Sequence, residues 1–416
     1  MIPYPEHLNT IFDTLKKFHI KPVIVGGYIR DTLLHRTSKD IDIELYGINS
    51  LEAVEKILKK FGRVSSVGKS FGVCKLSFED LDLDFSLPRT EEKISSGHNG
   101  FKVSTNAGLD FYTASKRRDF TINAIGFDVI EKTLLDPHNG KKDLKSSLLR
   151  YVNKESFIED PLRILRAVQF CSRFSLTMDE ALFRLCQEMI AKKMLEELPH
   201  ERIFEEIKKL LLLSEKPSYG LVLLKEIGAF AYFSEFAFLN KKNWEKTLAS
   251  LDAMALLQRE TKEENITLFL ALMTYFLESN ASNSLLKKLT NDKKILQNIE
   301  ALRVTAINSE ISNSALMRVA QITNIHTSIL LHIALYPEKK SLFLKIKERA
   351  KTLNILHTQA KPILQGRDLL ALGLVASEKF SKILMSAYEA QMDGIFDNHH
   401  EGFLWLKKKL LEEFLI

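Results

Sequence analysis

The sequence predicts an α+β head, in which helices cover a mixed sheet, followed by an all-α remainder. Short alternating apolar segments, which are typical of strands, occur almost only within residues 1–145. After about Tyr151 they nearly disappear, and long amphipathic stretches rich in Leu, Lys, Glu and Ala follow. Because 416 residues exceed one ordinary core, we expect two to four modules.

Hydrophobic periodicity predicts the elements of the head. Helical periodicity covers residues 5–18 and 50–61. The expected strands are 22–26, 40–46, 63–67, 72–78 and 81–87. Residues 88–100 are polar, with small side chains and two glycines, and this composition predicts a mobile loop beside the last strand. The alternative interpretation is an ordinary surface loop without a specific function.

The overall composition is that of a soluble globular protein, with 45% hydrophobic and 27% charged residues. The net charge of +6 suits a polyanionic partner without requiring one. Cys74, Cys171 and Cys186 are odd in number and widely spaced, which argues against a disulfide framework or a zinc site. Without a signal-like N-terminus or a membrane-length apolar run, we expect a cytoplasmic protein with no membrane partner and no obligate protein partner.

Carboxylates at alternate positions distinguish the segment 40–46. Side chains two apart on a strand point to the same side, so Asp40 and Asp42 share one face with Glu44. Adjacent carboxylates repel unless a cation lies between them, and Mg²⁺ prefers such oxygen ligands. We therefore expect Asp40 and Asp42 to be catalytic residues that bind Mg²⁺. The alternative is a half-buried edge strand with a solvated acidic face.

A third carboxylate is expected from the strand 81–87, whose polar face carries Asp82 and Asp84. If this strand lies beside 40–46, one of the two can complete a two-metal cluster. Such clusters bind the attacking and leaving oxygens of phosphoryl transfer. Asp84 is the catalytic candidate, although the sequence does not distinguish it from Asp82.

Two glycines end the first strand. Gly26 and Gly27 allow the backbone to approach a phosphate closely, and Arg30 offers a planar fork for phosphate oxygens. The alternative is a simple strand-to-helix turn, with Arg30 paired to Asp31. A glycine pair alone is weak evidence, but it stands beside two carboxylates on one face.

Five ordered motifs carry a resemblance to a known family. They are Gly-Gly-Tyr-Ile-Arg-Asp at 26–31 with Asp-Ile-Asp at 40–42, Arg-Arg-Asp-Phe-Thr-Ile-Asn-Ala at 117–124, Asp-Pro-His-Asn-Gly at 136–140, Glu-Asp-Pro-Leu-Arg-Ile-Leu-Arg at 159–166, and His-Glu-Arg-Ile-Phe-Glu-Glu at 200–206. Together they resemble the nucleotidyltransferases of the DNA polymerase beta superfamily. More narrowly, the chain is similar to bacterial tRNA nucleotidyltransferases (CCA-adding enzymes) and the related poly(A) polymerases. The resemblance is close over about the first half of the chain and loose beyond it.

The resemblance implies nucleotide contacts from the second motif. Arg118 and Asp119 resemble residues that contact the sugar and phosphates, and Asn123 resembles the asparagine that completes the motif. A helix cap or an ion-pair network that holds the head to the next segment is the alternative.

The fourth motif is expected to read the nucleotide base. Residues 157–170 read as one helix, which places Asp160 and Arg163 on the same face. A carboxylate and a guanidinium together can meet a base edge, and Arg166 could stack on the base or reach phosphate. The alternative role for Asp160 is a helix cap before Pro161. Gln169 stands where relatives often have arginine, so its contribution to nucleotide binding is open.

The resemblance implies template-independent addition of CMP and AMP to the 3′ end of tRNA from CTP and ATP, with Mg²⁺ and release of pyrophosphate. Poly(A) polymerase activity, or addition of only A or only CC, is the alternative. It also implies a catalytic head at 1–145, a base-recognising neck at 146–215, a body at 216–335 and a tRNA-binding tail at 336–416. A tRNA-binding scaffold with an inactive head is less consistent with the intact Asp40, Asp42 and Asp84.

Overall fold

The computed structural model describes residues 2–67, 73–93, 101–106, 108–308 and 310–413. The chain forms two compact units. The first comprises Met1–Ser214 and Tyr219–Ser234, and the second comprises Glu215–Ser218 and Glu235–Ile416. The expected division into head, neck, body and tail stays a prediction.

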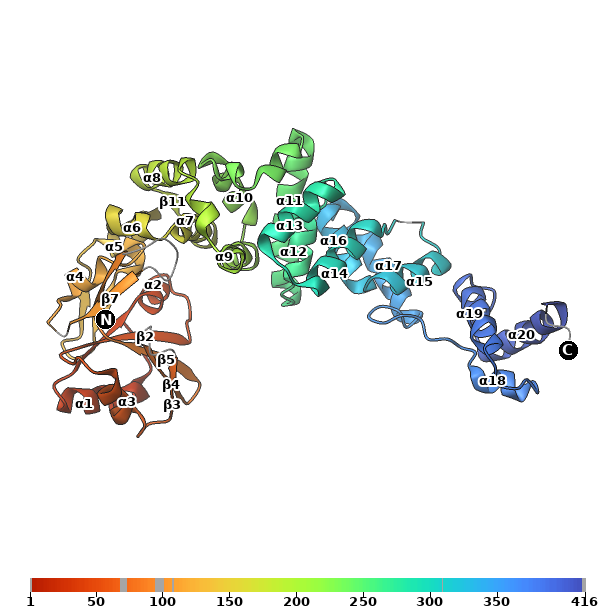
Figure 1. Ribbon diagram of the computed structural model, residues 1–416, viewed down its shortest axis with the longest axis horizontal. Helices are drawn as coiled ribbons and strands as arrows, with labels where there is room; N and C mark the ends of the chain where they lie inside the picture. Colours follow the sequence, from red (N-terminus) through yellow and green to blue (C-terminus); the bar gives the residue numbers. More distant parts are fainter. Residues whose placement is uncertain (1, 68–72, 94–100, 107, 309, 414–416) are drawn as a thin grey trace. The chain divides into compact units, whose positions relative to one another are not determined.

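A mixed sheet forms the N-terminal part of the first unit (Figure 1). Its strands are β1 (Lys21–Val25), β2 (Asp40–Tyr46), β3 (Arg63–Val67), β4 (Val73–Phe78), β5 (Leu81–Ser86), β8 (Gly126–Asp128) and β9 (Thr133–Leu135). They lie in the order β3-β4-β5-β2-β1-β8-β9, and every neighbouring pair is antiparallel except β2 and β5. The five expected strands are confirmed to within one residue at each end.

Strand β2 crosses the middle of the sheet with two different faces. Ile41, Ile43 and Leu45 on its apolar face have at most 1% of their surface exposed. The other face carries the carboxylates, because successive side chains of a strand alternate in direction. The expected alternation is therefore present at the centre of the sheet rather than on an edge strand.

Two helices pack beside the sheet. Helix α1 (Asn9–Lys17), preceded by a 3₁₀ turn at Glu6–Leu8, contacts β1, and α3 (Leu51–Leu58) contacts β3 and β4. Helix α3 begins where the Ser50 side chain accepts a hydrogen bond from the amide of Ala53 at 3.2 Å. The two helices also contact each other, and their apolar sides are buried. The helical periodicity of the sequence therefore marked surfaces that pack in the core.

A hairpin follows β5 where a loop was expected. Strand β6 (Arg89–Lys93) pairs antiparallel with β7 (Phe101–Thr105). The expectation of an irregular segment was therefore wrong for 89–93, and residues 94–100 lie outside the described residues. The polar composition concealed β6, because Arg89–Lys93 does not carry the apolar alternation by which a strand is recognised.

The rest of the first unit is mainly helical. Its helices are α2 (Gly27–Leu33), α4 (Phe111–Ser115), α5 (Gly140–Lys145), α6 (Lys154–Glu159), α7 (Leu162–Phe174), α8 (Glu180–Ala191), α9 (His200–Leu213) and most of α10 (Pro217–Glu226). A short parallel pair joins β10 (Leu148–Leu149) to β11 (Thr177–Met178). Helices α7 and α9 pack against each other.

The single helix expected at 157–170 is instead two helices. Helix α6 ends at Glu159, Asp160 is extended with φ −119° and ψ 99°, and α7 begins at Leu162. The break has a steric cause, because a residue before proline is pushed out of the helical region. Pro161 therefore places Asp160 in a bend between helices rather than on a helix face.

The second unit is helical throughout its described secondary structure (Figure 1). Its helices are α11 (Lys241–Thr261), α12 (Ile266–Thr274), α13 (Ser279–Leu289), α14 (Lys293–Val304), α15 (Asn313–Ile322), α16 (Ile325–Leu335), α17 (Lys340–Thr352), α18 (Gly366–Ala371), α19 (Lys379–Met392) and α20 (His399–Glu413). Helix α12 is buried nearly all round and packs against α11 and α16. A separate cluster around Leu369, Ile383 and Leu406 joins α18, α19 and α20.

Among the helices that the structure describes, none has both the length and the apolar character needed to cross a lipid bilayer.

Candidate active site

The predicted acidic residues meet on the two central parallel strands. Asp42 of β2 is the register partner of Asp84 of β5, and Asp40 is the partner of Asp82. Register partners on adjacent strands point to the same side of the sheet. The structure thus brings Asp40, Asp42 and Asp84 onto one face, at the N-terminal end of β2.

Electrostatics show that these carboxylates influence each other. Although the Asp42 side chain keeps exposed surface, desolvation by the surrounding protein raises its pKa, Arg118 lowers it, and Asp84 and Asp40 raise it further. Asp84 is half-buried and forms an ion pair with Lys75 of β4, with Nζ 3.1 Å from Oδ2. Of the two candidates for the third carboxylate, Asp84 therefore lies beside Asp42, while Asp82 is exposed beside Asp40.

The donor set fits a divalent cation in chemistry, although its side chains are not closed around one. In the described part of the chain, no three carboxylate, imidazole or thiolate groups are close enough together to hold a metal ion as they stand. Instead, Lys75 pairs with Asp84, and the charge of Arg118 acts on Asp42. The positive charges of Lys75 and Arg118 thus reduce the repulsion between Asp84 and Asp42.

Gly26 brings the backbone against this acidic face. It has φ 72° and ψ −129°, a conformation that side chains disfavour. A Cβ atom at this position would lie 3.1 Å from Arg118 Nη1 and 3.5 Å from Asp42 Oδ2. The absence of a side chain therefore leaves room between a carboxylate and a guanidinium, at the point where α2 begins with Gly27.

Glu44 also lies on the acidic face of β2, but its role differs from that of Asp40 and Asp42. Its surface is completely buried, and it accepts hydrogen bonds from Tyr46 Oη at 2.8 Å, Arg117 Nη2 at 2.7 Å and Arg118 Nη2 at 3.3 Å. Burial alone would raise the pKa of Glu44, but the charges of Arg118 and Arg117 lower it below its ordinary value. Glu44 therefore holds the arginine pair beside Asp42 and Gly26.

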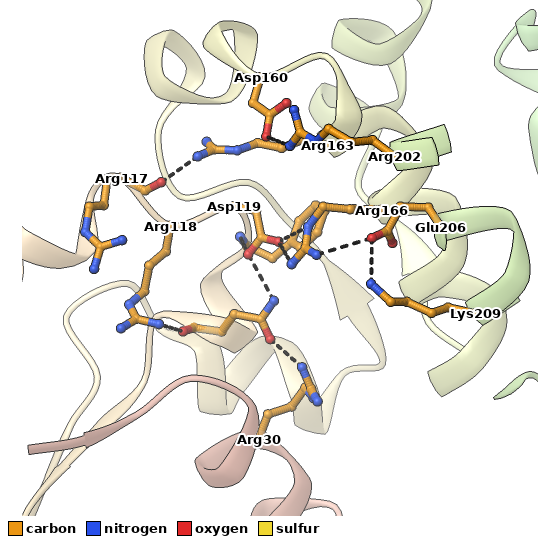
Figure 2. A network of polar contacts seen from close by, with 12 residues as sticks. Arg30, Arg117, Arg118, Asp119, Asp160, Arg163, Arg166, Arg202, Glu206 and Lys209 are labelled. Carbon is orange, nitrogen blue, oxygen red and sulfur yellow. Dashed lines mark hydrogen bonds and ion pairs between the residues drawn. The ribbon is translucent and has the colours of Figure 1, made fainter. Parts of the chain in front are cut away.

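A chain of polar contacts continues from Arg118 to the glycine turn (Figure 2). Arg118 Nη1 donates to the carbonyl oxygen of Asn123 at 3.3 Å, and Asn123 Nδ2 donates to Asp119 Oδ1 at 3.0 Å. Asn123 Oδ1 accepts from Arg30 Nη1 at 2.7 Å, while Arg30 Nε donates to Asp31 at 2.8 Å. The structure thus joins four predicted nucleotide-binding residues, and the Arg30–Asp31 pair weighed as an alternative is present.

The same chain reaches the two packed helices. Arg166 of α7 donates to Asp119 Oδ2 and lies 3.7 Å from Glu206 of α9, which also accepts from Lys209 at 2.8 Å. Figure 2 shows Asp119, Arg166, Glu206 and Lys209 following one another from the loop of the head to α9. Burial alone would raise the pKa of Asp119, but Arg166 and the hydrogen bond from Asn123 hold it at about 2.

Asp160 and Arg163 both have protein partners. Asp160 Oδ1 accepts from the amide of Leu162 at 3.2 Å, and Oδ2 pairs with Arg202 of α9 at 3.1 Å. Arg163 donates to the carbonyl oxygens of Arg117 at 2.6 Å and Ser156 at 2.8 Å. The cap-like bond weighed as an alternative is therefore present, and base recognition by these two side chains stays a prediction.

Gln169 lies apart from the exposed residues of the site. It is only 1% exposed, and its Nε2 atom has no hydrogen-bond partner among the described residues. Its predicted part in nucleotide binding would require this amide to be uncovered.

Sequence reasoning missed several members of this network. Alternation placed Glu44 on the acidic face, but it could not show that Arg117 and Arg118, more than seventy residues later, bury it. Lys75 pairs with Asp84 of another strand, and Glu206 pairs with Arg166 of another helix as well as with Lys209 of its own. No local sequence pattern signals such contacts, although Glu206 stands inside the fifth motif.

Two family models match the chain. Residues 23–150 match the poly A polymerase head domain, and residues 175–239 match a model described as a probable RNA and SrmB- binding site of polymerase A. Nucleotidyltransferases of the polymerase beta type generally use divalent metal ions.

Curated relatives align over part of their length. The chain is 36% identical over 213 residues to a multifunctional CCA protein of Stenotrophomonas maltophilia, which is 50% of either chain. It is 32% identical over 243 residues to a CCA-adding enzyme of Alteromonas mediterranea, which is 58% of either chain. The aligned region thus spans about half the length of the curated relatives that it matches.

Solved structures share the fold over nearly the whole chain. The Bacillus stearothermophilus CCA-adding enzyme in complex with CTP has a TM-score of 0.75 at 22% identity, covering 98% of both chains. The Thermotoga maritima CCA-adding enzyme complexed with tRNA has a TM-score of 0.70 at 21% identity, covering 98% of this chain and 97% of that one. Residues 23–150 and 175–239 are therefore similar, in this order, to the head and RNA-binding models of polymerase A, on a fold shared with CCA-adding enzymes.

Proposed function

We propose that this chain adds CMP and AMP, from CTP and ATP, to the 3′ end of tRNA and thereby builds or repairs its CCA terminus. The observation that carries the proposal is the pairing of Asp42 with Asp84 in register, next to the side-chain-free space at Gly26. Carboxylates beside a backbone that a phosphate can approach form the arrangement that nucleotidyl transfer requires. The CCA proteins among the relatives support tRNA as the acceptor.

In the proposed reaction, the 3′-hydroxyl of the RNA attacks the α-phosphorus of the nucleotide, the hydroxyl loses its proton, and pyrophosphate leaves. Gly26 and Gly27 admit the triphosphate to the backbone, and Arg118 lies against this space to neutralise its charge. Glu44 fixes Arg118 through an ion pair, which limits the reorganisation needed when the nucleotide binds.

Mg²⁺ is the proposed metal, because all candidate ligands are hard carboxylate oxygens. Asp40 and Asp42 would hold it, with Asp84 as the third carboxylate. In the proposed two-metal arrangement, one bound ion would lower the pKa of the RNA hydroxyl and a second would neutralise the triphosphate. Lys75 pairs with Asp84 at 3.1 Å, and this ion pair would weaken when Asp84 also binds the metal ion.

Base selection is assigned to the bend between α6 and α7. Asp160 accepts hydrogen bonds and Arg163 donates them, so together they can complement the edge of cytosine or adenine. Because Arg202 and the carbonyl oxygens of Arg117 and Ser156 hold these two groups, nucleotide binding would exchange some of these partners for the base. Arg166, fixed by Asp119 and Glu206, would support this region from the next turn of α7.

The test uses tRNA transcripts that end at the discriminator base, at C and at CC, each incubated with one labelled nucleotide at a time. The proposal expects CMP on the first two acceptors and AMP on the third. Long A tracts would instead identify a poly(A) polymerase, and growth with only one nucleotide would identify an enzyme of partial specificity. Absence of any incorporation by the full chain with Mg²⁺ would contradict the proposal.

A further inference from the structure

Three guanidinium groups surround the ring of Phe174 at the end of α7. The Cζ atoms of Arg30, Arg36 and Arg173 lie 4.5, 4.9 and 4.8 Å from the ring centroid. No two of these charges are more than about 10 Å apart, which is about one Debye length at 0.1 M salt, so solvent screens them only partly from each other. Phe174 itself is 8% exposed, so the arginines cover its ring.

The charges of this cluster are not balanced. Arg30 binds Asp31 through Nε and Nη2 at 2.8 and 2.7 Å and Asn123 through Nη1, so its donors are engaged. Within the described residues, the guanidinium groups of Arg36 and Arg173 have neither a hydrogen bond nor an ion pair. Burial lowers the pKa of Arg173, and the positive charges of Arg30 and Arg36 lower it further, while the carboxylate of Asp31 raises it. Among the described residues, two cations on one ring therefore have no carboxylate bonded to them, and Asp31, which is bonded to Arg30, compensates Arg173 only from a distance.

Backbone geometry fixes both free arginines. Helix α2 closes with His35 at φ 57° and with the amide of Arg36 bonded to the carbonyl of Asp31 at 2.8 Å. Helix α7 closes with Ser175 at φ 54° and with the amide of Leu176 bonded to the carbonyl of Cys171 at 3.0 Å. These closed helix ends fix the backbone from which the side chains of Arg36 and Arg173 reach the same ring.

We propose that Arg36 and Arg173, on the Phe174 platform, bind a backbone phosphate of the RNA acceptor. The inference rests on the proposed function. The nucleotide's own phosphates are assigned to the space at Gly26, which faces Asp42 and Arg118, while the neighbouring Gly27 faces Arg30 of the cluster, whose donors are already engaged. A positively charged surface is typical of sites that follow a nucleic-acid backbone. Such a contact attracts the RNA without reading its sequence.

The test measures the dissociation constant of the full chain for tRNA without CCA, over about 50 to 200 mM salt. Arg36→Gln and Arg173→Gln are each expected to reduce the slope of log K against log salt by about 0.7 to 0.9, because each removes one phosphate contact. By the same relation, binding at 0.1 M salt should weaken about fivefold for each variant. Arg184→Gln is the matched control, because Arg184 is an exposed arginine of α8 paired with Glu180.

Other outcomes would overturn the inference. An unchanged salt slope for Arg36→Gln, or an equal loss for Arg184→Gln, would show that the cluster makes no specific phosphate contact. A higher KM for CTP with unchanged tRNA binding would assign the phosphate to the nucleotide. A lower thermal midpoint with unchanged tRNA binding would assign the arginines to the helix ends, where cations are stabilising. Exposed Arg36 decides the matter if Arg173→Gln fails to fold.

The proposed function is tested separately by the unmodified chain. If that chain adds nucleotides while the Arg36 and Arg173 variants bind tRNA normally, only the phosphate site is wrong. If the unmodified chain neither binds tRNA nor adds nucleotides, the proposed function is wrong and the site falls with it.

Discussion

Arg166 donates two hydrogen bonds to a single oxygen of Asp119, from Nε at 2.8 Å and from Nη2 at 2.5 Å. Asp119 stands in the loop after α4, and Arg166 stands on α7. The pair therefore joins the loop that holds Arg118 to the helix that follows Asp160. A side chain expected to contact the nucleotide therefore also anchors α7.

Substitution of Asp119 should change the acid sensitivity of the fold. Its pKa of about 2 lies below the ordinary value of 3.8, so its contribution to stability is complete above pH 4 and lost as pH falls towards 2. Asp119→Asn should therefore lower the free energy of unfolding at pH 7 by about 2 kcal/mol. The difference from the unmodified chain should shrink below pH 4 in urea titrations, and a constant difference down to pH 2 would contradict this.

Asp42→Ala should abolish nucleotide incorporation while tRNA binding stays intact, because the carboxylate is assigned to the metal and not to the RNA. The rate should fall by at least about a hundredfold, since even residues that only orient metal ligands have effects of that size. Incorporation kinetics and filter binding measure the two quantities. Asp80→Ala, an exposed carboxylate between β4 and β5, is the control. Undiminished incorporation by Asp42→Ala would refute the metal assignment.

The third carboxylate can be identified by comparing two neighbours on β5. Asp84→Asn should lose incorporation by about tenfold or more, because Asp84 is the register partner of Asp42. Asp82→Asn, which makes the same chemical change two residues earlier, should keep nearly full activity. Incorporation rates at saturating nucleotide and Mg²⁺ measure this difference. The reverse order of effects would assign the third ligand to Asp82.

Glu44→Gln should destabilise the first unit, because it leaves Arg117 and Arg118 buried against a neutral group. Loss of one partner of a buried ion pair has an effect of about 3 kcal/mol or more. Urea unfolding followed by circular dichroism measures it, with exposed Glu52→Gln of α3 as the control. Tyr46→Phe removes one hydrogen bond to the same carboxylate and should lower stability by about 1.5 kcal/mol. Equal stability of Glu44→Gln and Glu52→Gln would show that the arginines do not depend on this charge.

Asp160→Ala should blur the choice among nucleotides more than it reduces the total rate. Removal of the carboxylate leaves Arg163 without an acceptor beside it to complement a base edge. Competition among CTP, ATP, UTP and GTP on one acceptor measures selectivity, and we expect about a tenfold loss or more. The preceding residue provides the control Glu159→Ala. Unchanged selectivity would leave Asp160 with its cap and its pair with Arg202 alone.

Local periodicity was sufficient to predict the sheet that carries the site. Strands β2, β4 and β5 alternate apolar and polar residues, and β1 ends in a short apolar run, so their bounds could be read from the sequence to within one residue. Strand β6 has no such pattern, and it pairs with β7. The bend at Asp160 was missed because helical periodicity on both sides outweighed the effect of Pro161 on the preceding residue.

The site residues could be named from motifs, but their contacts could not. Glu44 illustrates the limit, since alternation predicts its face and not its two arginine partners. Arg36 and Arg173 belong to helix ends far apart in the sequence, and only the packing of α2 near α7 brings both onto Phe174. Contacts between charged residues that are far apart in the sequence produce no periodic sequence pattern from which they could be predicted.

The buried Glu44 also protects the chain against misassembly. If the register of β2 shifted by one residue, Glu44 would point into the hydrophobic core and Ile43 would face the arginines. Such a shift would bury the carboxylate of Glu44 without a counterion, which is energetically costly. A strand with only aliphatic side chains would not have this cost. The carboxylate of Glu44 thus disfavours incorrect strand registers during folding.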